Sequence, residues 1–310
     1  MEIKNILVAG NYYEEFKLHL IDHQSKEFRF ISPANITAAD LQWADTYVGS
    51  RPCMNFNLSH LKWVHSFNAG VNNYLELNGW IENNVLLTRT VCSFGEKISE
   101  YCLSYILRDL QKHQEFERKQ HQKQWKPETP KMIKDHTFVI LGTGEIGQKV
   151  AKMFNSFGAT VYGVSRSGQH KDYFSEVVDH TSSNSVVSRA DWIISTLPLT
   201  QDTYKIFNHQ FFASMNQSVF INVGRGATVD ELALIKALDS GRIRYAVLDV
   251  LSQEPLPEDS VLWERKDVLI TPHISAVTDI NEAVECFFET LHKIENNGIL
   301  HNMVDVMKGY

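Results

Sequence analysis

Phe138-Val-Ile-Leu-Gly-Thr-Gly-Glu-Ile-Gly147 is the stretch that decides the fold of the second part of this chain. It lies between an apolar run predicted to be a strand, residues 137–141, and a helical pattern over residues 146–157. Its GxGxxG glycines are Gly142, Gly144 and Gly147. In a dinucleotide-binding unit these glycines make the tight turn, admit a pyrophosphate and pack the helix against the strand. Since a helix N-terminus also attracts anions, the stretch predicts a bound dinucleotide.

The end of the next predicted strand, residues 160–164, indicates which dinucleotide binds. Ser165-Arg166-Ser167 stands where an NAD enzyme usually places an acid for the ribose hydroxyls. An acid would repel a 2′-phosphate, whereas a hydroxyl beside an arginine can bind one. The sequence therefore favours NADP(H) over NAD(H). The alternative is that Arg166 is a solvated loop residue and the ribose is bound in another way.

Bulk composition agrees with a globular enzyme. A chain of 310 residues exceeds the usual size of one hydrophobic core, so two domains are expected. A net charge of −7 argues against a nucleic-acid partner, which normally needs a basic surface. The amino terminus enters a short apolar strand without a signal-peptide pattern, and no apolar run is long enough to span a bilayer. A cytoplasmic protein without a membrane partner is expected.

Cysteine and histidine spacings predict no metal site. The four cysteines lack CxxC spacing, which favours reduced structural thiols over disulfides or zinc. His60 and His65 lie on a segment expected at a sheet edge, and we expect both to be solvated.

The pattern along the chain predicts two α/β units. Short strand-like runs alternate with helical segments over the first hundred residues, which indicates a parallel sheet. A long helical pattern follows, from Glu96 to about Gln122, and could cross between domains, carry a dimer contact or simply cover the surface. Beyond it, further strands end in polar residues. Because ligands bind at the carboxyl ends of parallel strands, the candidate site residues there are Thr196, Arg225, Asp249 and His273.

Three strings carry a resemblance to a known family. They are Ile221-Asn-Val-Gly-Arg-Gly-Ala-Thr-Val-Asp-Glu231, Asp249-Val-Leu-Ser-Gln-Glu-Pro-Leu-Pro257 and Thr271-Pro-His-Ile-Ser275. In this order they resemble the D-isomer-specific 2-hydroxyacid dehydrogenases, and the ending Asn302 to Tyr310 resembles the glyoxylate/hydroxypyruvate reductase branch. The resemblance implies an α/β fold of two Rossmann-like domains with parallel doubly wound sheets. A flavodoxin-like substrate domain would comprise residues 1–95 and 285–310, and an NAD(P)-binding domain residues 96–284.

The resemblance also places the catalytic arginine, glutamate and histidine on Arg225, Glu254 and His273. When hydride reaches a keto carbon, the oxygen needs a proton, which an imidazolium can donate near neutral pH. Glu254 would favour the charged imidazolium and orient its ring. Arg225 presents a planar fork of donors for the carboxylate of a 2-keto acid.

Other predicted site residues serve binding. The predicted cofactor-binding residues are Gly142, Gly144, Glu145, Ile146, Gly147, Ser165, Arg166, Ser167, Thr196, Leu197, Pro198, Thr203, Val223, Gly224, Asp249, His273 and Ser275. For Asp249 the alternatives are a contact on the nicotinamide side and a helix cap. The predicted substrate-binding residues are Arg51, Ala69, Gly70, Val71, Arg225 and His273.

Three functions follow from the resemblance. The first is an NADPH-dependent reductase of small 2-keto acids such as glyoxylate or hydroxypyruvate, expected to be a homodimer. The second resembles an NAD-dependent D-3-phosphoglycerate dehydrogenase, for which Arg51 could bind the substrate phosphate. Against it stand Ser165 and Arg166 and a chain that ends without a regulatory domain. The third is a dinucleotide-sensing co-repressor, but neither end shows an obvious partner-recruiting extension.

Overall fold

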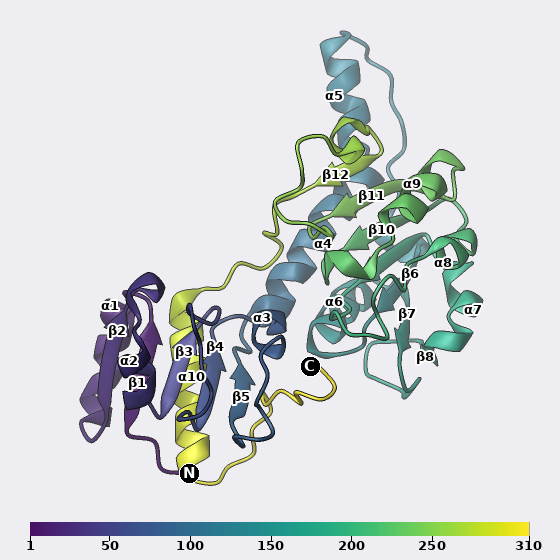
Figure 1. The fold of residues 1–310 in the computed structure, drawn as a ribbon. Helices are drawn as coiled ribbons and strands as arrows, with labels where there is room; N and C mark the ends of the chain where they lie inside the picture. Colours follow the sequence, from purple (N-terminus) through teal and green to yellow (C-terminus); the bar gives the residue numbers. More distant parts are fainter. Residues whose placement is uncertain (310) are drawn as a thin grey trace. The chain divides into compact units, whose positions relative to one another are not determined.

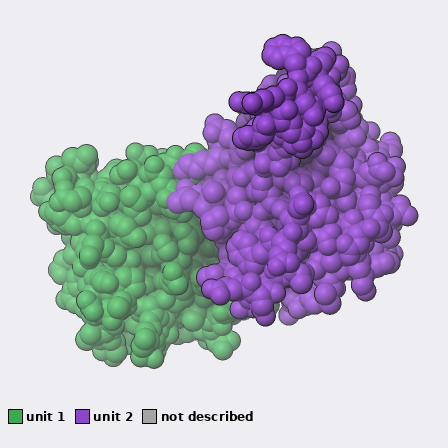
Figure 2. Space-filling view, turned by 90° about the horizontal axis from the view of Figure 1, so that it is seen from above, with its two compact units in different colours: residues 1–93, 278–310 green, residues 94–277 purple. Residues whose placement is uncertain are grey.

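The computed structural model describes residues 1–309, and Tyr310, the last residue of the ending quoted above, lies outside this range. The chain divides into two compact units, coloured separately in Figure 2. Unit 1 combines Met1–Ser93 with the chain from Thr278 onward, and unit 2 is Phe94–Val277. Each unit contains one sheet. All strand pairs in both sheets are parallel, which confirms the predicted α/β fold class.

Unit 1 has a five-stranded sheet in the order β2-β1-β3-β4-β5, labelled in Figure 1. Its strands are β1 (Asn5–Ala9), β2 (Glu27–Ile31), β3 (Thr46–Gly49), β4 (Trp63–Ser66) and β5 (Leu86–Arg89). This is the flavodoxin-like doubly wound order. Its helices are α1 (Tyr13–Leu20), α2 (Ala38–Trp43), α3 (Asn72–Leu75) and α10 (Ile280–Glu295). Buried residues of α1 and α10 pack on one face of the sheet, and those of α2 and α3 on the other.

Unit 2 has a seven-stranded sheet in the order β12-β11-β10-β9-β6-β7-β8. Its strands are β6 (Thr137–Leu141), β7 (Thr160–Ser165), β8 (Glu176–Asp179), β9 (Trp192–Ser195), β10 (Ser218–Asn222), β11 (Ile243–Leu248) and β12 (Val268–Ile270). The sheet grows from β6 in one direction through β7 and β8, and in the other through β9 to β12. This is the Rossmann pattern, with its switch point between β6 and β9, where ligands bind.

Helices cover both faces of this second sheet. They are α4 (Phe94–Leu110), α5 (His113–His121), α6 (Glu145–Ser156), α7 (Asn184–Val187), α8 (His209–Ala213) and α9 (Glu231–Asp239). Apolar residues of α4 and α6 form one core with the sheet, and those of α7, α8 and α9 form the other. The ring of Phe154 on α6 stacks on Phe138 of β6 with 4.4 Å between centroids, so α6 is fixed directly over the strand that precedes it.

The expected long helix over residues 96–122 is two helices, so this prediction was wrong. Helix α4 ends at Leu110, and Lys112 adopts a left-handed conformation with φ of 57° before α5 begins. Leu110 is the last residue of α4 in the core, and no apolar stripe continues beyond it to hold a straight helix. The chain instead projects as α5 in Figure 1 and returns, with the Lys131 N–H donating to the Leu110 carbonyl.

The expectation that His65 is solvated was also wrong, whereas His60 is exposed. Strand β4 lies inside the sheet, between β3 and β5, and His65 has no exposed surface. Its Nδ1 lies 2.8 Å from the Thr88 hydroxyl on the neighbouring strand. Burial lowers the pKa of His65 to about 3, because the protonated ring would lose its hydration there.

This burial predicts a pH dependence of stability. Below about pH 6.5 the unfolded chain protonates His65 while the folded protein keeps it neutral, so the free energy of unfolding falls as the pH falls towards about 3. At about pH 5 the loss from this one residue is about 2 kcal/mol relative to neutral pH. Urea unfolding of wild type and His65→Gln at about pH 7 and pH 5 measures it. The difference in the free energy of unfolding between the two pH values should be smaller in His65→Gln than in wild type. It should remain as in wild type in the exposed control His60→Gln.

Candidate active site

The glycine turn after β6 is held by the loop after β9, across the switch point. Gly142 has φ of +101°, a conformation that favours glycine. The Thr196 hydroxyl lies 3.1 Å from both the Leu141 and the Gly142 carbonyl oxygens. Thr196 therefore has a structural contact at the position where it was predicted, and its contact with a cofactor remains a prediction.

The other two glycines of the motif differ in their surroundings. A Cβ on Gly147 would stand 1.8 Å from the Gly142 carbonyl oxygen, so α6 approaches the turn too closely for any side chain. A Cβ on Gly144 would meet no heavy atom of residues 1–309 within 4 Å. Gly144 caps α6, and Glu145 and Ile146 form its first turn. Open space beside the first turn of a helix, whose N–H groups point towards its N-terminal end, fits the pyrophosphate of a dinucleotide.

Ser165, Arg166 and Ser167 follow at the end of β7. The Ser165 hydroxyl accepts a hydrogen bond of 3.1 Å from the Gly168 N–H, and Arg166 is exposed. The neighbouring acid by strand register is Asp179 on β8. Its carboxylate accepts the N–H groups of Thr181 and Ser182 at 2.8 and 3.1 Å, so it is the N-cap of the short 3-10 helix His180–Ser182.

Further hydroxyls hold the loop after β9, which contains Leu197 and Pro198. The Thr203 hydroxyl donates to the Pro198 carbonyl at 2.6 Å and accepts the Thr200 N–H at 2.7 Å. A Cβ on Gly224 would stand 2.5 Å from the Leu197 carbonyl oxygen. The loop after β9 therefore packs directly against the loop after β10.

Arg225 follows Val223 and Gly224 at the end of β10. Arg225 is half-buried, and its Nη1 donates to the Gly224 carbonyl at 2.7 Å. Its own carbonyl accepts from Asn222 Nδ2 at 3.1 Å and from the Thr228 hydroxyl at 2.6 Å. Asn222, which is fully buried, was not predicted as a site residue. Its signal in the sequence is an amide at a strand end, directly before the glycines.

Glu254 and His273 form a pair in the structure. His273 Nδ1 lies 2.8 Å from Glu254 Oε2, and Glu254 Oε1 accepts the Leu251 N–H at 3.0 Å. The side chains are 51% and 38% exposed, so a small molecule has access to them. Because Nδ1 contacts the carboxylate, Nε2 is the ring nitrogen left to exchange a proton with a ligand.

The Arg225 loop and the Glu254 loop meet at a glycine. A Cβ on Gly226 would stand 1.9 Å from the carbonyl carbon and oxygen of Leu251. The Glu231 carboxylate also accepts the Ser252 N–H at 3.1 Å, which ties the first turn of α9 to the same loop. The loops that carry the predicted arginine and glutamate are therefore packed backbone to backbone.

Asp249, at the end of β11, is only 1% exposed. Its Oδ1 accepts from the Thr271 hydroxyl at 2.6 Å and the Ile274 N–H at 2.8 Å, and its Oδ2 from the Ser275 N–H at 2.9 Å. None of the helices between residues 1 and 309 begins at Asp249, so it is not a helix cap. It holds the loop that contains His273, and its predicted contact with the cofactor remains a prediction.

The predicted substrate residues of unit 1 lie on two loops that contact each other. Asn68 Nδ2 donates to the Ser50 carbonyl at 3.1 Å, and the Tyr74 hydroxyl donates to the Gly49 carbonyl at 2.7 Å. The first bond joins the residues directly before Arg51 and before residues 69–71, and the second ties helix α3 to the end of β3. Arg51 is exposed, Ala69 and Gly70 are partly exposed, and Val71 is buried.

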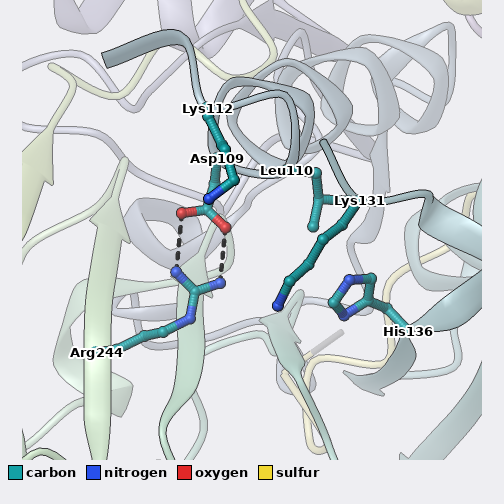
Figure 3. Close-up of a pocket in the computed structure, with 6 residues that line it drawn as sticks. All are labelled: Asp109, Leu110, Lys112, Lys131, His136 and Arg244. Atoms are coloured by element: carbon teal, nitrogen blue, oxygen red, sulfur yellow. Dashed lines mark hydrogen bonds and ion pairs between the residues drawn. The ribbon is translucent and has the colours of Figure 1, made fainter. Parts of the chain in front are cut away.

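A separate cavity of about 230 Å³ lies at the opposite edge of the unit 2 sheet (Figure 3). Its lining includes His136, which precedes β6, and Arg244, near the start of β11. Arg244 makes two bonds of 2.8 and 2.7 Å to the Asp109 carboxylate. The cavity is at the amino ends of the strands, whereas the predicted site residues follow the carboxyl ends.

No group of three or more His, Cys, Asp or Glu side chains is arranged to hold a metal ion within residues 1–309. None of the helices there is long and apolar enough to cross a membrane.

The fold is that of a dinucleotide-binding protein, with a GxGxxG turn at the switch point of a Rossmann sheet. The model of the D-isomer specific 2-hydroxyacid dehydrogenase NAD binding domain matches residues 103–275, more than half of the chain. The chain therefore belongs to the D-isomer specific 2-hydroxyacid dehydrogenase family. It is an oxidoreductase, and the prediction of a nicotinamide dinucleotide as cofactor is confirmed.

Known relatives support the same family. Glyoxylate/hydroxypyruvate reductase A of Serratia proteamaculans is 33% identical over 260 residues, which cover 82% of this chain and 83% of the relative. The NADPH-dependent glyoxylate/hydroxypyruvate reductase of Sinorhizobium meliloti, solved with NADP and sulfate, is 29% identical. The two structures superpose with a TM-score of 0.85, and the matched region covers 99% of this chain and 100% of the relative. The predicted resemblance to the glyoxylate/hydroxypyruvate reductase branch is confirmed.

A phosphoglycerate dehydrogenase of Lactobacillus plantarum is also similar, at 31% identity. The matched region covers 97% of this chain and 100% of that enzyme, with a TM-score of 0.58. The chain thus matches structures from both enzyme groups that its sequence resembles.

The two glycines with different surroundings give a test of the nucleotide site. Gly147→Ala should destabilise the protein by several kcal/mol, because its methyl group would overlap the Gly142 carbonyl. Gly144→Ala should change the free energy of unfolding by about 1 kcal/mol or less, since its methyl group points into open space. It should nevertheless weaken NADPH binding at least about tenfold, because the pyrophosphate needs that space. Urea unfolding and fluorescence titration measure both effects. Full-strength binding by Gly144→Ala would place the cofactor elsewhere.

Proposed function

We propose that this protein is an NADPH-dependent reductase of small 2-keto acids, with glyoxylate and hydroxypyruvate as its substrates. The observation that carries the proposal is the pair formed by His273 and Glu254, at 2.8 Å, on loops that follow the strand ends of unit 2. A bound reduced nicotinamide supplies the hydride that reaches the keto carbon of the substrate. The remaining steps belong to side chains of this chain.

In the proposed reaction His273 donates the proton that the carbonyl oxygen needs when hydride reaches the carbon. Its Nδ1 contacts Glu254, so the proton leaves from Nε2. The contact with the carboxylate holds the ring through Nδ1 and so orients Nε2 for the transfer. In the reverse direction neutral His273 accepts the hydroxyl proton of the 2-hydroxy acid.

Arg225 is proposed to bind the carboxylate of the substrate. One of its guanidinium nitrogens donates to the Gly224 carbonyl, which holds the side chain close to its own loop. Its other N–H groups form part of the planar fork that matches a carboxylate. Bonds to the Arg225 carbonyl from Asn222 and Thr228 fix the backbone from which the side chain extends.

NADP(H) is the proposed form of the cofactor. Ser165 and the exposed Arg166 offer a hydroxyl and a cation at the end of β7, and the neighbouring Asp179 is the N-cap of the 3-10 helix that follows β8. These groups suit a ribose 2′-phosphate better than a free 2′-hydroxyl. The similar enzyme from Sinorhizobium meliloti, described as NADPH-dependent, supports this choice.

A phosphoglycerate dehydrogenase remains the second candidate. The similar structure from Lactobacillus plantarum and the exposed Arg51 favour it, since a substrate phosphate needs a cation. It would use NAD, which Ser165 and Arg166 do not favour. A homodimer, a cytoplasmic location and the assignment of residues 51 and 69–71 to the substrate stay predictions.

Removing the proposed proton donor should abolish most turnover without loss of cofactor binding. We choose His273→Asn, because His273 has φ of +56° and asparagine tolerates that conformation better than alanine. With NADPH and glyoxylate or hydroxypyruvate, kcat should fall by about 10²- to 10⁴-fold. Glu254→Gln keeps an acceptor for the Leu251 N–H but removes the charge, and should lose less.

Steady-state assays and NADPH titration measure these effects. The wild-type panel also includes pyruvate, bulkier keto acids, and 3-phosphoglycerate with NAD. A near-normal rate in His273→Asn would exclude the mechanism. Turnover of 3-phosphoglycerate alone would support the second candidate, and no turnover of any compound would favour a dinucleotide-sensing protein.

Cofactor choice has its own test in Arg166→Ala. Loss of a charge-assisted bond to the 2′-phosphate should raise KM for NADPH by about tenfold and leave KM for NADH nearly unchanged. Arg118→Ala, on α5, is the matched control, because it removes the same charge from an exposed arginine that pairs with Glu115. An equal effect of Arg166→Ala on both cofactors would contradict a phosphate contact.

A further inference from the structure

A hydrogen-bonded network of three side chains connects helix α4 to the loop that carries His273. The Tyr101 hydroxyl lies 2.6 Å from the Thr271 hydroxyl, and the Thr271 hydroxyl lies 2.6 Å from Asp249 Oδ1. Tyr101 is about 170 residues before Thr271 in sequence and comes from a different element. Nothing in the sequence motifs singled it out.

The donors and acceptors in this network have one consistent order. A carboxylate only accepts hydrogen bonds, so Thr271 donates its single hydroxyl proton to Asp249. The Tyr101 hydroxyl must then donate to the Thr271 oxygen. Burial raises the pKa of Tyr101 well above its ordinary value, so the tyrosine keeps this proton throughout the usual pH range.

At Asp249, the network reaches the backbone of His273 and of the two residues that follow it. The Asp249 carboxylate binds the N–H groups of Ile274 and Ser275, and the Asp249 carbonyl accepts the His273 N–H at 2.9 Å. His273 itself has φ of +56°, a left-handed conformation that is uncommon for residues other than glycine. Such a backbone persists where surrounding bonds hold it in place.

We propose that Tyr101 is a positioning residue for the reaction, which holds the His273 loop in its productive conformation through Thr271 and Asp249. The inference rests on the proposed function of His273 as proton donor. Tyr101 does not need to touch the substrate or cofactor. Its hydroxyl fixes the Thr271 rotamer that donates to Asp249, and the buried carboxylate then keeps its two bonds to the loop.

The structure offers a matched control one helical turn away. Tyr105 packs edge-on against Tyr101 with 4.8 Å between ring centroids, and both rings are partly buried. Within the part of the chain that the structure describes, no hydrogen bond of the Tyr105 hydroxyl is found. Tyr105→Phe therefore removes the same atom from the same helix and leaves the hydrogen bonds of the network in place.

The first experiment compares Tyr101→Phe and Tyr105→Phe in steady-state assays with NADPH and hydroxypyruvate. Loss of one buried hydrogen bond should lower kcat by about three- to tenfold in Tyr101→Phe. The dissociation constant of NADPH and KM should stay within about twofold, because the glycine turn and Arg225 are untouched. Tyr105→Phe should match wild type. Equal effects of the two variants, or a loss confined to KM, would overturn the proposal.

A double-mutant cycle tests whether Tyr101 acts through Thr271. Thr271→Val removes the middle hydroxyl at nearly constant shape and should lower kcat at least as much as Tyr101→Phe. In that background Tyr101→Phe should have no further effect, since its acceptor is gone. Thr271→Ser, which keeps the hydroxyl, should restore kcat to within about threefold of wild type. Effects of Tyr101→Phe that multiply unchanged in the Thr271→Val background would overturn the proposed path.

A readout without turnover separates this proposal from the proposed function. In histidine-selective NMR spectra, with the His273 signals assigned by His273→Asn, Tyr101→Phe should shift the His273 ring signals and Tyr105→Phe should not. If wild type turns over none of the keto acids but the shift occurs, the proposed function fails, while the coupling of Tyr101 to the His273 loop through Thr271 and Asp249 stands. If the ring signals stay unchanged in Tyr101→Phe, the positioning role fails whatever the substrate.

Discussion

Parallel pairing of the seven strands in unit 2 is the constraint on which the candidate site depends. Since every pair is parallel, all carboxyl ends lie at one edge of the sheet. The glycine turn, Arg225 and His273 each follow a different strand, yet all are delivered to this edge. The strand order reverses between β6 and β9, which is where ligands bind in such sheets. At the N-terminus of α6, a Cβ on Gly144 would meet no neighbour among residues 1–309.

Glycines then allow the loops at that edge to touch through their backbones. Gly147 approaches the turn at Gly142, Gly224 approaches Leu197, and Gly226 approaches Leu251. At each place a Cβ would stand 2.5 Å or less from a backbone atom, so no larger residue fits without movement. The glycines of the Val-Gly-Arg-Gly string therefore serve the position of Arg225 and of the Glu254 loop, in addition to any contact with a ligand.

Much of this arrangement could be predicted from the sequence, because parallel strands buried on both faces appear as short apolar runs with polar residues at their ends. The same property explains the error at His65. A strand covered on both faces gives no alternation, and the partner of His65, Thr88, is on another strand. The break at Lys112 depends on where α4 leaves the core, and the bonds of Asp249 reach residues 22 to 26 positions later, which no local spacing reveals.

Two carboxylates near His273 differ in their burial and in the groups that they bind. Glu254 is 38% exposed and contacts the ring, which must gain and lose a proton as the proposed reaction proceeds. Asp249 is 1% exposed and binds only hydroxyl and amide donors, which do not titrate in the working range. A buried carboxylate held by several fixed donors resists movement. The backbone of His273 is thus held independently of the contact between its ring and Glu254.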